Sequence, residues 1–251
     1  MCFQDNGAKM LTEITDTTGL ETLEIFADTD KFNLWLFETL APFCKNNLLE
    51  IGSGIGNISE FLLAHFSTVS LSDLRNEYCE MLQQKFSSNG HLKSIHLIDL
   101  SEKEFEKKYN PLRDSFDTII ASNVVEHIED DHLAVRNCKW MLQKGGRLVV
   151  LVPAYNWLYN GFDKELGHFR RYNKKRLTSL FTDEGFEIVH AQYFNFAGIF
   201  GWWFSGTVLR KKVLPKNQLV LYNKLIPLIR LADRLVMRQS GLSVIVAGEK
   251  K

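Results

Sequence analysis

The sequence lacks the features that mark secreted and nucleic-acid-binding proteins. Its four cysteines (Cys2, Cys44, Cys79 and Cys138) are scattered without a C-x-x-C pair, which favours reduced thiols and a cytoplasmic protein. The first residues contain no apolar stretch of the kind found in signal peptides, so we expect none. The formal net charge is +0, which gives no global argument for nucleic acid as a partner. We also find no internal repeat and no low-complexity tract.

The composition itself is that of an ordinary globular protein. Of its 251 residues, 45% are hydrophobic and 24% are charged, so the chain can bury a core. This length suits one large α/β domain, or one domain with an insertion. The charge is uneven, however, because one stretch near the C-terminus is basic. Residues 210–238 contain a single acidic residue, Asp233. The basic residues in this stretch are Arg210, Lys211, Lys212, Lys216, Lys224, Arg230, Arg234 and Arg238.

The segment Leu48–Ser59 organises the rest of the chain. Apolar residues lead up to Glu50 and Ile51, glycines follow at alternate positions, and a helical pattern begins after them. A buried strand that turns abruptly into a helix needs residues without a Cβ, so that backbone and ligand approach closely. The helix start also offers unpaired N–H groups to an anionic ligand. The segment therefore predicts a nucleotide-like cofactor, with a plain structural turn as the alternative.

The spacing of the glycines indicates which cofactor. A dinucleotide fingerprint reads G-x-G-x-x-G, whereas here the third glycine comes one residue early and a glutamate precedes the first by two positions. This E-x-G-x-G-x-G pattern resembles the first motif of class I S-adenosylmethionine-dependent methyltransferases. A strand predicted at Phe116–Ser122, followed by N-V-V-E-H-I, resembles that family more specifically. The resemblance implies a doubly wound, seven-stranded Rossmann-like α/β sheet, mostly parallel with an antiparallel last strand, and S-adenosyl-L-methionine as cosubstrate.

The hydrophobic pattern predicts elements that fit this fold. Aromatic and leucine residues at helical spacing predict one or two helices within 21–45. We expect Gly145 and Gly146 to end the helix before the fifth strand. The other predicted helices and strands alternate along the chain: helices at 58–66, 74–86, 101–108, 130–143 and 173–185, and strands at 68–71, 92–97, 147–152, 186–195 and 242–248.

Residues at the ends of these strands are candidates for holding the cofactor. Asp73 ends the second strand about twenty positions after the first glycine, where a carboxylate accepts both ribose hydroxyls; capping the next helix is its alternative role. The resemblance implies that Asp99 binds the adenine amino group and the N–H of Leu100 the ring, and helix capping is again the alternative for Asp99. The full set is Glu50, Gly52, Ser53, Gly54, Gly56, Asp73, Leu74, Asp99, Leu100 and Asn123.

The segment Val152–Tyr172 has no helical or strand period, yet it is dense in Tyr, Trp, Asp, His and Arg. A loop this long is functional or disordered, and its aromatic content argues against disorder. It resembles the loop of a methyltransferase subgroup linked to glycosyltransferases and to surface-polysaccharide or lipid pathways. The candidate acceptor-binding residues, with ion pairing or loop packing as the alternative, are Tyr155, Tyr159, Asp163, Arg170, Arg171 and Tyr172.

Two histidines are candidates for the general base, because neutral imidazole titrates in the useful range. His127 follows the fourth strand, and His168 lies in the aromatic loop; a structural role is the alternative for each. Glu126, His127 and His168 together offer metal ligands, and some RNA-end and quinone methyltransferases bind Mg²⁺ through E-x-x-E-H. Asn123 stands where the first glutamate would be. We therefore expect no metal.

The connection before the last strand is far longer than a hairpin loop. Its first part is uncharged but too short and glycine-rich for a transmembrane helix, and residues 218–238 predict a basic amphipathic helix kinked at Pro227. We interpret residues 196–238 as part of a helical insertion (196–241) that forms either a substrate lid or a peripheral contact with the inner face of a membrane. The remaining units are a loose N-terminus (1–20) and the cofactor-binding domain (21–195 with 242–251).

These patterns together predict a methyltransferase whose acceptor is a small molecule, glycan, lipid-linked saccharide or quinone-like compound, methylated on oxygen. Nucleic acid is not expected as a partner. Two alternatives stay open. One is a nicotinamide-dependent oxidoreductase or epimerase, which conflicts with the glycine spacing. The other is a non-catalytic binding protein that keeps the cofactor fold.

Overall fold

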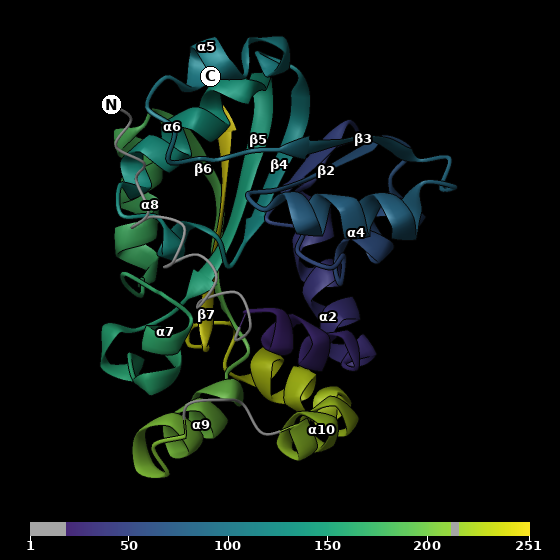
Figure 1. Ribbon diagram of the computed structural model, residues 1–251. Coiled ribbons are helices and arrows are strands. Elements are labelled where there is room, and N and C mark those ends of the chain that lie inside the picture. Colours follow the sequence, from purple (N-terminus) through teal and green to yellow (C-terminus); the bar gives the residue numbers. More distant parts are fainter. Residues whose placement is uncertain (1–18, 212–215) are drawn as a thin grey trace, which may run out of the picture.

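The structure is a computed structural model that describes residues 19–211 and 216–251 (Figure 1). Most of the expected loose N-terminal segment, residues 1–20, lies outside these residues. The described chain begins within a helix that runs to residue 27. Helix α2 (Asp30–Leu40) and a short turn η1 (Ala41–Phe43) follow before the first strand. The prediction of helices in this region is confirmed.

A seven-stranded sheet forms the centre of the molecule, in the order β3-β2-β1-β4-β5-β7-β6. Strand β7 is antiparallel to both of its neighbours, and the remaining pairs are parallel. This confirms the predicted doubly wound sheet with an antiparallel last strand. The strands are β1 (Leu48–Ile51), β2 (Val69–Asp73), β3 (Leu92–Leu97), β4 (Phe116–Ser122), β5 (Leu142–Pro153), β6 (Phe186–Phe194) and β7 (Ser243–Lys250).

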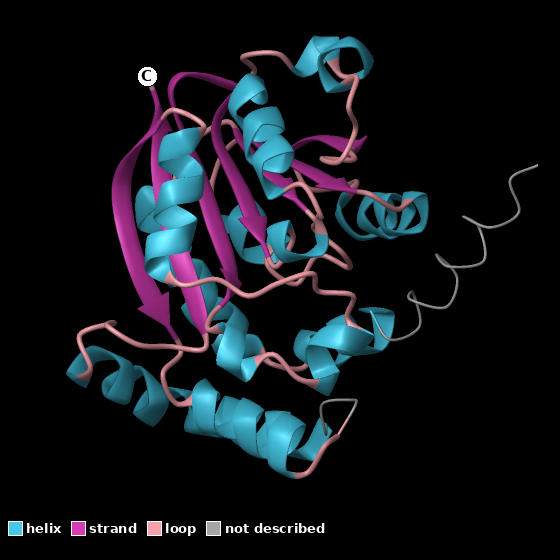
Figure 2. Ribbon diagram, turned by 90° about the vertical axis from the view of Figure 1, so that its left-hand side faces the viewer, coloured by secondary structure: helices cyan, strands magenta, loops and turns pink. Residues whose placement is uncertain are grey.

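Helices cover both faces of the sheet, giving three layers (Figure 2). Successive strand residues point to opposite faces, so Ile119 packs into one apolar core and Ile120 into the other. One core also contains side chains of α5 (Phe105–Lys108), α6 (Asp131–Met141) and α8 (Lys174–Asp183). The other contains side chains of α2, α3 (Ser59–His65), α4 (Asn76–Phe86) and α10 (Lys216–Leu235).

One predicted boundary is wrong. Gly145 and Gly146 do not end the sixth helix, because α6 already ends at Met141 and both glycines lie inside β5. Gly145 has φ 75° beside a shift in the β4–β5 register. A Cβ on Gly146 would lie 2.8 Å from the Gln143 carbonyl oxygen. The two glycines therefore allow the irregular backbone of β5. A pair of glycines after a helical pattern is also typical of a helix C-terminus, which explains the wrong prediction.

The insertion before β7 consists of α9 (Gly198–Trp202), the π-helical turn η5 (Trp203–Val208) and α10. The buried carboxylate of Asp233 on α10 accepts the backbone N–H groups of Asn195 (3.2 Å) and Phe196 (2.5 Å), which fixes this helix to the end of β6. Helix α10 continues through Pro227. Among residues 19–211 and 216–251, no helix is both long enough and apolar enough to cross a membrane.

Candidate active site

The candidate site lies where the strand order reverses, at the carboxyl ends of β1 and β4, which is where ligands bind in open α/β sheets. After β1, Gly52, Gly54 and Gly56 have φ of 71°, 54° and 84°. A Cβ on Gly52 would lie 2.5 Å from Cγ2 of Val124, and one on Gly56 would lie 2.5 Å from Phe86. Both the dihedral angles and the close packing therefore require glycine here.

Two carboxylates flank the glycine turn. Asp73, at the end of β2, accepts the backbone N–H of Gly54 at 2.9 Å and that of Arg75 at 3.1 Å. Burial raises the pKa of Asp73, and these two bonds offset part of the rise. Glu50 is buried and accepts the hydroxyl of Ser59. Burial raises the pKa of Glu50 to about 7.

The helix that ends at residue 27 covers the glycine turn. The side chain of Leu23 lies 2.9 Å from the place of a Cβ on Gly54. The amide of Asn57 donates to the Leu23 carbonyl oxygen at 2.9 Å. The N-terminal helix is thus part of the cofactor side of the site, a contact that the sequence did not reveal. Ser53, within the turn, donates its N–H to the Ser72 carbonyl at 2.9 Å, linking the turn to β2.

The residues predicted to hold the adenine, Asp99 and Leu100, follow the end of β3. Asp99 is partly buried and Leu100 is buried. Oδ1 of Asp99 accepts the N–H of Ser101 at 2.8 Å and its hydroxyl at 2.6 Å, so a local turn already uses one oxygen. Leu100 is buried, whereas Leu74, directly after Asp73, is exposed. Helix α5 begins only at Phe105, so the Asp99 carboxylate does not cap it.

Asn123 opens the second part of the site, directly after β4. Its backbone has φ 54°, and its N–H donates to the Leu151 carbonyl at 2.9 Å. The short turn η3 (Val125–His127) follows and carries Glu126 and His127. Since Val124 packs on Gly52, this turn lies directly against the glycine turn.

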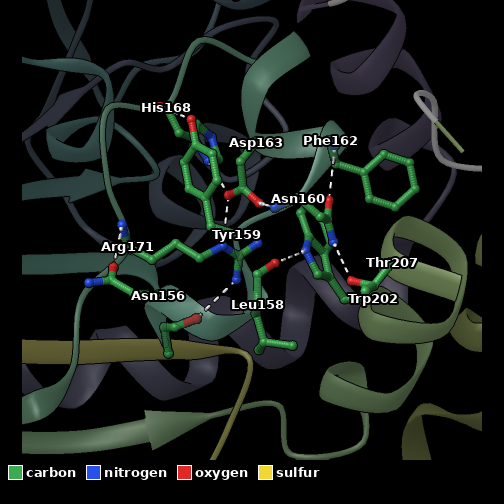
Figure 3. Close-up of polar contacts among 11 residues, drawn as sticks. Asn156, Leu158, Tyr159, Asn160, Phe162, Asp163, His168, Arg171, Trp202 and Thr207 are labelled. Carbon is green, nitrogen blue, oxygen red and sulfur yellow. Dashed lines mark hydrogen bonds and ion pairs between the residues drawn. The ribbon is translucent and has the colours of Figure 1, made fainter. Parts of the chain in front are cut away.

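Three side chains of the loop after β5 form a buried ionic cluster (Figure 3). Oδ1 of Asp163 lies 2.8 Å from Nδ1 of His168 and accepts from Nε of Arg171 at 2.7 Å. Arg171 also donates to the Ala154 carbonyl at 3.0 Å. Asp163 is 0% exposed and Arg171 is 1% exposed. Burial alone would raise the pKa of Asp163, but the bonds from His168 and Arg171 leave it lowered overall.

The two candidate bases lie together. The ring centroids of His127 and His168 are 4.7 Å apart, at an interplanar angle of 80°. His168 is buried, whereas His127 is exposed. Partial desolvation, together with the nearby His168 and Arg75, lowers the pKa of His127 to about 4. Because Val124 packs on Gly52 and His127 ends the turn that follows Val124, the two histidines lie beside the glycine turn.

Glu126 is a further candidate functional residue. From the sequence we considered it only as a candidate metal ligand. Its carboxylate is fully buried, and neither oxygen has a hydrogen-bond partner within the described part of the chain. Burial raises the pKa of Glu126 to about 8. One ligand atom each of Glu126, His127 and His168 lie within 4.8 Å of one another, so these residues have the spacing to hold a cation. That no metal is needed stays a prediction.

The other predicted acceptor residues have internal partners. The hydroxyl of Tyr159 donates to the His168 carbonyl at 2.7 Å. Arg170 and the buried Tyr172 converge on Asp131, at 2.9 Å and 2.8 Å. The hydroxyl of Tyr155 lies 3.0 Å from that of Ser240. Asp163, Arg171 and Tyr172 are thus buried rather than open to an acceptor in this structure.

Comparison with known proteins decides the family. Residues 23–191 match the model of a family described as a methyltransferase domain, which is more than half of the chain. The chain belongs to this methyltransferase family. The resemblance read from the glycine spacing and from the E-H-I segment is therefore confirmed. The link of the aromatic loop to a particular subgroup stays a prediction.

Relatives of this methyltransferase include segments of much larger proteins. It is 23% identical over 124 residues to a highly reducing polyketide synthase of Pyrenophora dematioidea, covering 46% of this chain and 5% of that protein. It is 34% identical over 115 residues to a polyketide synthase-nonribosomal peptide synthetase of Aspergillus clavatus, covering 44% and 3%. The methyltransferase thus matches only a small fraction of these proteins.

Solved structures share the fold at low sequence identity. Phosphoethanolamine N-methyltransferase 2 of Haemonchus contortus, in complex with S-adenosyl-L-methionine, has a TM-score of 0.56 at 17% identity, covering 87% of this chain and 52% of that one. Geranyl diphosphate C-methyltransferase of Streptomyces coelicolor, in complex with Mg²⁺, geranyl diphosphate and S-adenosyl-L-homocysteine, has a TM-score of 0.59 at 11% identity, covering 86% and 77%.

Proposed function

We propose that this methyltransferase transfers the methyl group of S-adenosyl-L-methionine to a hydroxyl group. The observation that supports this most is the convergence of two structures at one edge of the sheet. The glycine turn with Asp73 provides a nucleoside site, and the Asp163–His168 pair provides a base, with η3 packed between them. The cofactor contacts that we propose are those named from the sequence, with Asp73 on the ribose.

When bound, S-adenosyl-L-methionine supplies a methyl group on a sulfonium, and the acceptor oxygen forms its bond to that carbon as the carbon–sulfur bond breaks. The acceptor hydroxyl must lose its proton in this step. His168 is the base that we propose. Because its Nδ1 bonds to Asp163, a neutral ring that donates Nδ1–H keeps Nε2 free to accept the proton. Asp163 then stabilises the imidazolium that forms.

His127 orients the acceptor in this proposal. Its lowered pKa keeps the ring neutral near pH 7, so it offers a hydrogen bond without adding a second positive charge. His127 is exposed and its ring contacts that of the buried His168. We propose that an acceptor hydroxyl bound by His127 is handed to His168 for proton removal.

The acceptor that we propose is a glycan, a lipid-linked saccharide or a quinone-like molecule. The aromatic loop and the apolar insertion beside it suit a large or partly apolar acceptor better than a small polar metabolite. Among the structural neighbours, one has geranyl diphosphate bound, an apolar chain with an anionic end. Incubating the protein with panels of these acceptors, followed by mass spectrometry for a gain of one CH₂, tests this assignment.

Replacing the base gives the sharpest test of the mechanism. We expect His168→Ala to lower turnover about a hundredfold or more, with little change in the affinity for S-adenosylhomocysteine. His132→Ala is the matched control, because His132 also pairs with a carboxylate, Glu184 at 2.9 Å, but on the outer helix α6. If His168→Ala and His132→Ala have equal turnover, His168 is not the base and has a structural role.

Calorimetry separates the two remaining alternatives. An oxidoreductase or epimerase requires NAD(P) to bind and S-adenosylhomocysteine not to bind. A non-catalytic protein requires cofactor binding without methylation across the whole acceptor panel. We expect binding of S-adenosylhomocysteine and methylation of at least one acceptor class.

A further inference from the structure

The insertion presents an exposed apolar face at one end of the molecule. Both views place α9 and α10 along the base, opposite the C-terminus and α5 (Figures 1 and 2). One side of α10 packs against α2 and the sheet through the buried Ile226 and Ile229. The opposite side carries exposed leucines seven residues apart, which places them in one stripe. Leu221 is 58% exposed, Leu228 67% and Leu235 74%.

Helix α9 and turn η5 add aromatic side chains at the same end. Phe200, Trp203 and Phe204 are exposed. Trp202 instead turns inward, where its Nε1 donates to the Leu158 carbonyl at 3.2 Å and its ring lies 4.7 Å from the Arg171 guanidinium. The exposed rings therefore belong to a segment that Trp202 anchors to the acceptor loop; of the three, Phe200 also packs against Phe196.

A cavity of about 470 Å³ lies between α2 and α10 and combines cations with apolar side chains. Arg230 is paired with Glu38 at 2.6 Å. Lys31 and Arg234, by contrast, have no ion pair with any residue that the structure describes. The lining consists of Lys31, Leu34, Ile226, Pro227, Arg230, Leu231 and Arg234. Unneutralised cations beside apolar groups suit an anionic headgroup whose acyl chain lies next to it.

We propose that this end of the methyltransferase docks on an anionic phospholipid bilayer. The cavity between α2 and α10 receives a lipid phosphate, and the exposed leucines of α10 enter the acyl boundary. Lys224 lies on the same side as the leucines, three residues after Leu221 and four before Leu228. Arg230 and Arg234 lie beside the cavity. A helix that combines exposed leucines with cations at their border has the composition of an interfacial helix. The proposal goes beyond the methyl transfer itself and does not depend on which acceptor is used.

The positive charge of this surface favours a bilayer over a second copy of the chain as its binding partner. A two-fold dimer sets the same patch against itself, so the unpaired Lys31 and Arg234 would face the same cations. An anionic surface neutralises them instead. Because α7 (Gly161–Glu165) contacts η5, docking also brings the acceptor loop near the lipid surface. A lipid-linked acceptor would then reach the site from the membrane.

Co-sedimentation of the full chain with vesicles tests the proposal. We expect binding to vesicles of phosphatidylglycerol and phosphatidylcholine, weaker binding at high salt, and little binding to phosphatidylcholine alone. The double variant Lys31→Gln with Arg234→Gln should bind about tenfold more weakly or worse, since each cation near the surface contributes appreciably. Leu221→Gln with Leu228→Gln should also weaken binding.

The charge-matched control is Lys103→Gln with Lys107→Gln, which removes the same charge from the opposite end beside α5 and should bind normally. Circular dichroism and S-adenosylhomocysteine binding, expected to be unchanged, separate a loss of docking from misfolding and from failure of the proposed function. Full chain left in the supernatant with anionic vesicles at low salt overturns the proposal. So does a dimer in sedimentation velocity that Leu228→Gln dissociates.

Discussion

The cofactor side and the acceptor side of the candidate site differ in what holds them together. On the cofactor side, glycines at positive φ and backbone N–H groups on Asp73 define the shape. On the acceptor side, Asp163, His168 and Arg171 bind one another through side chains that are almost completely buried. The first is a surface that a ligand completes, whereas the second is an ionic cluster that must form for the loop to fold. Substitutions should therefore affect ligand affinity on one side and folding stability on the other.

The largest effect is expected from Arg171→Met. It leaves the carboxylate of Asp163 buried beside His168 without its guanidinium partner. Removing one member of a buried ion pair costs about 3–5 kcal/mol of unfolding free energy. Urea denaturation followed by circular dichroism measures this loss, and adding Asp163→Asn to the same chain should recover part of it.

Arg170→Met is the matched control for that experiment. Arg170 pairs with Asp131 at 2.9 Å, but both side chains are partly exposed, at 17% and 11%. We expect a loss of about 1 kcal/mol, in the range of surface pairs. If both arginine variants unfold at the same urea concentration, the buried cluster does not hold the loop in the way we describe.

On the cofactor side, the largest loss of ligand affinity is expected from Asp73→Asn. The amide keeps an oxygen for the Gly54 N–H but loses the charge that strengthens bonds from ribose hydroxyls. A charged hydrogen bond contributes about 1.5–3 kcal/mol, so affinity for S-adenosylhomocysteine should fall about tenfold to a hundredfold. Calorimetry measures the affinity. Stability should fall less than for Arg171→Met, because a single backbone N–H, that of Arg75, loses its acceptor.

Asp99→Asn tests whether the nucleoside lies as we propose. In our proposal Asp99 accepts a single bond, from the adenine amino group, whereas Asp73 accepts both ribose hydroxyls. We expect a smaller loss of affinity than for Asp73→Asn. The opposite order would mean that Asp73 does not hold the sugar, and the cofactor assignment would have to be revised.

The sequence predicted the glycine turn of the cofactor side for a physical reason. Positive φ at Gly52, Gly54 and Gly56 nearly demands glycine, so spacing alone reveals the turn. Strand β4 was predicted at its observed bounds because a buried strand leaves an apolar run between turn residues. Strand β3 was also predicted at its observed bounds, although it is only partly buried and has no apolar run.

The acceptor side has no such local rule. Asp163 pairs with residues five and eight positions away in a loop without period, and the fold selects these partners. One local signal was present: Asn160 and Asp163 form a capping box that starts α7, and N-x-x-D is its signature. Trp202 and Trp203 are neighbours of the same residue type, so the sequence does not distinguish them. In the folded protein the Trp202 ring packs on Arg171, whereas Trp203 is exposed, because the position of the helix against the loop decides which ring turns inward.

The last prediction concerns one buried glutamate on each side. Glu50 accepts the Ser59 hydroxyl and has a pKa of about 7, whereas Glu126 lacks a partner among the described residues and has a pKa of about 8. Both pKa values are raised above the ordinary 4.5. At these two sites the folded protein therefore holds protons that the unfolded chain has released. The contribution of the two glutamates to stability is fully present below pH 4.5 and is lost as pH rises through their folded pKa values.

Glutamine variants separate the two contributions, because the amide resembles the protonated acid at every pH. Each proton gives a slope of at most about 1.4 kcal/mol per pH unit. Glu50→Gln should flatten the fall in stability below pH 7, and Glu126→Gln should flatten it up to pH 8. Between pH 7 and 8 only the Glu126 variant should differ from the parent in the slope of unfolding free energy against pH, which urea denaturation at several pH values measures. An unchanged slope there would mean that Glu126 is ionised and paired, and the acceptor side would then resemble the cofactor side in satisfying its carboxylates.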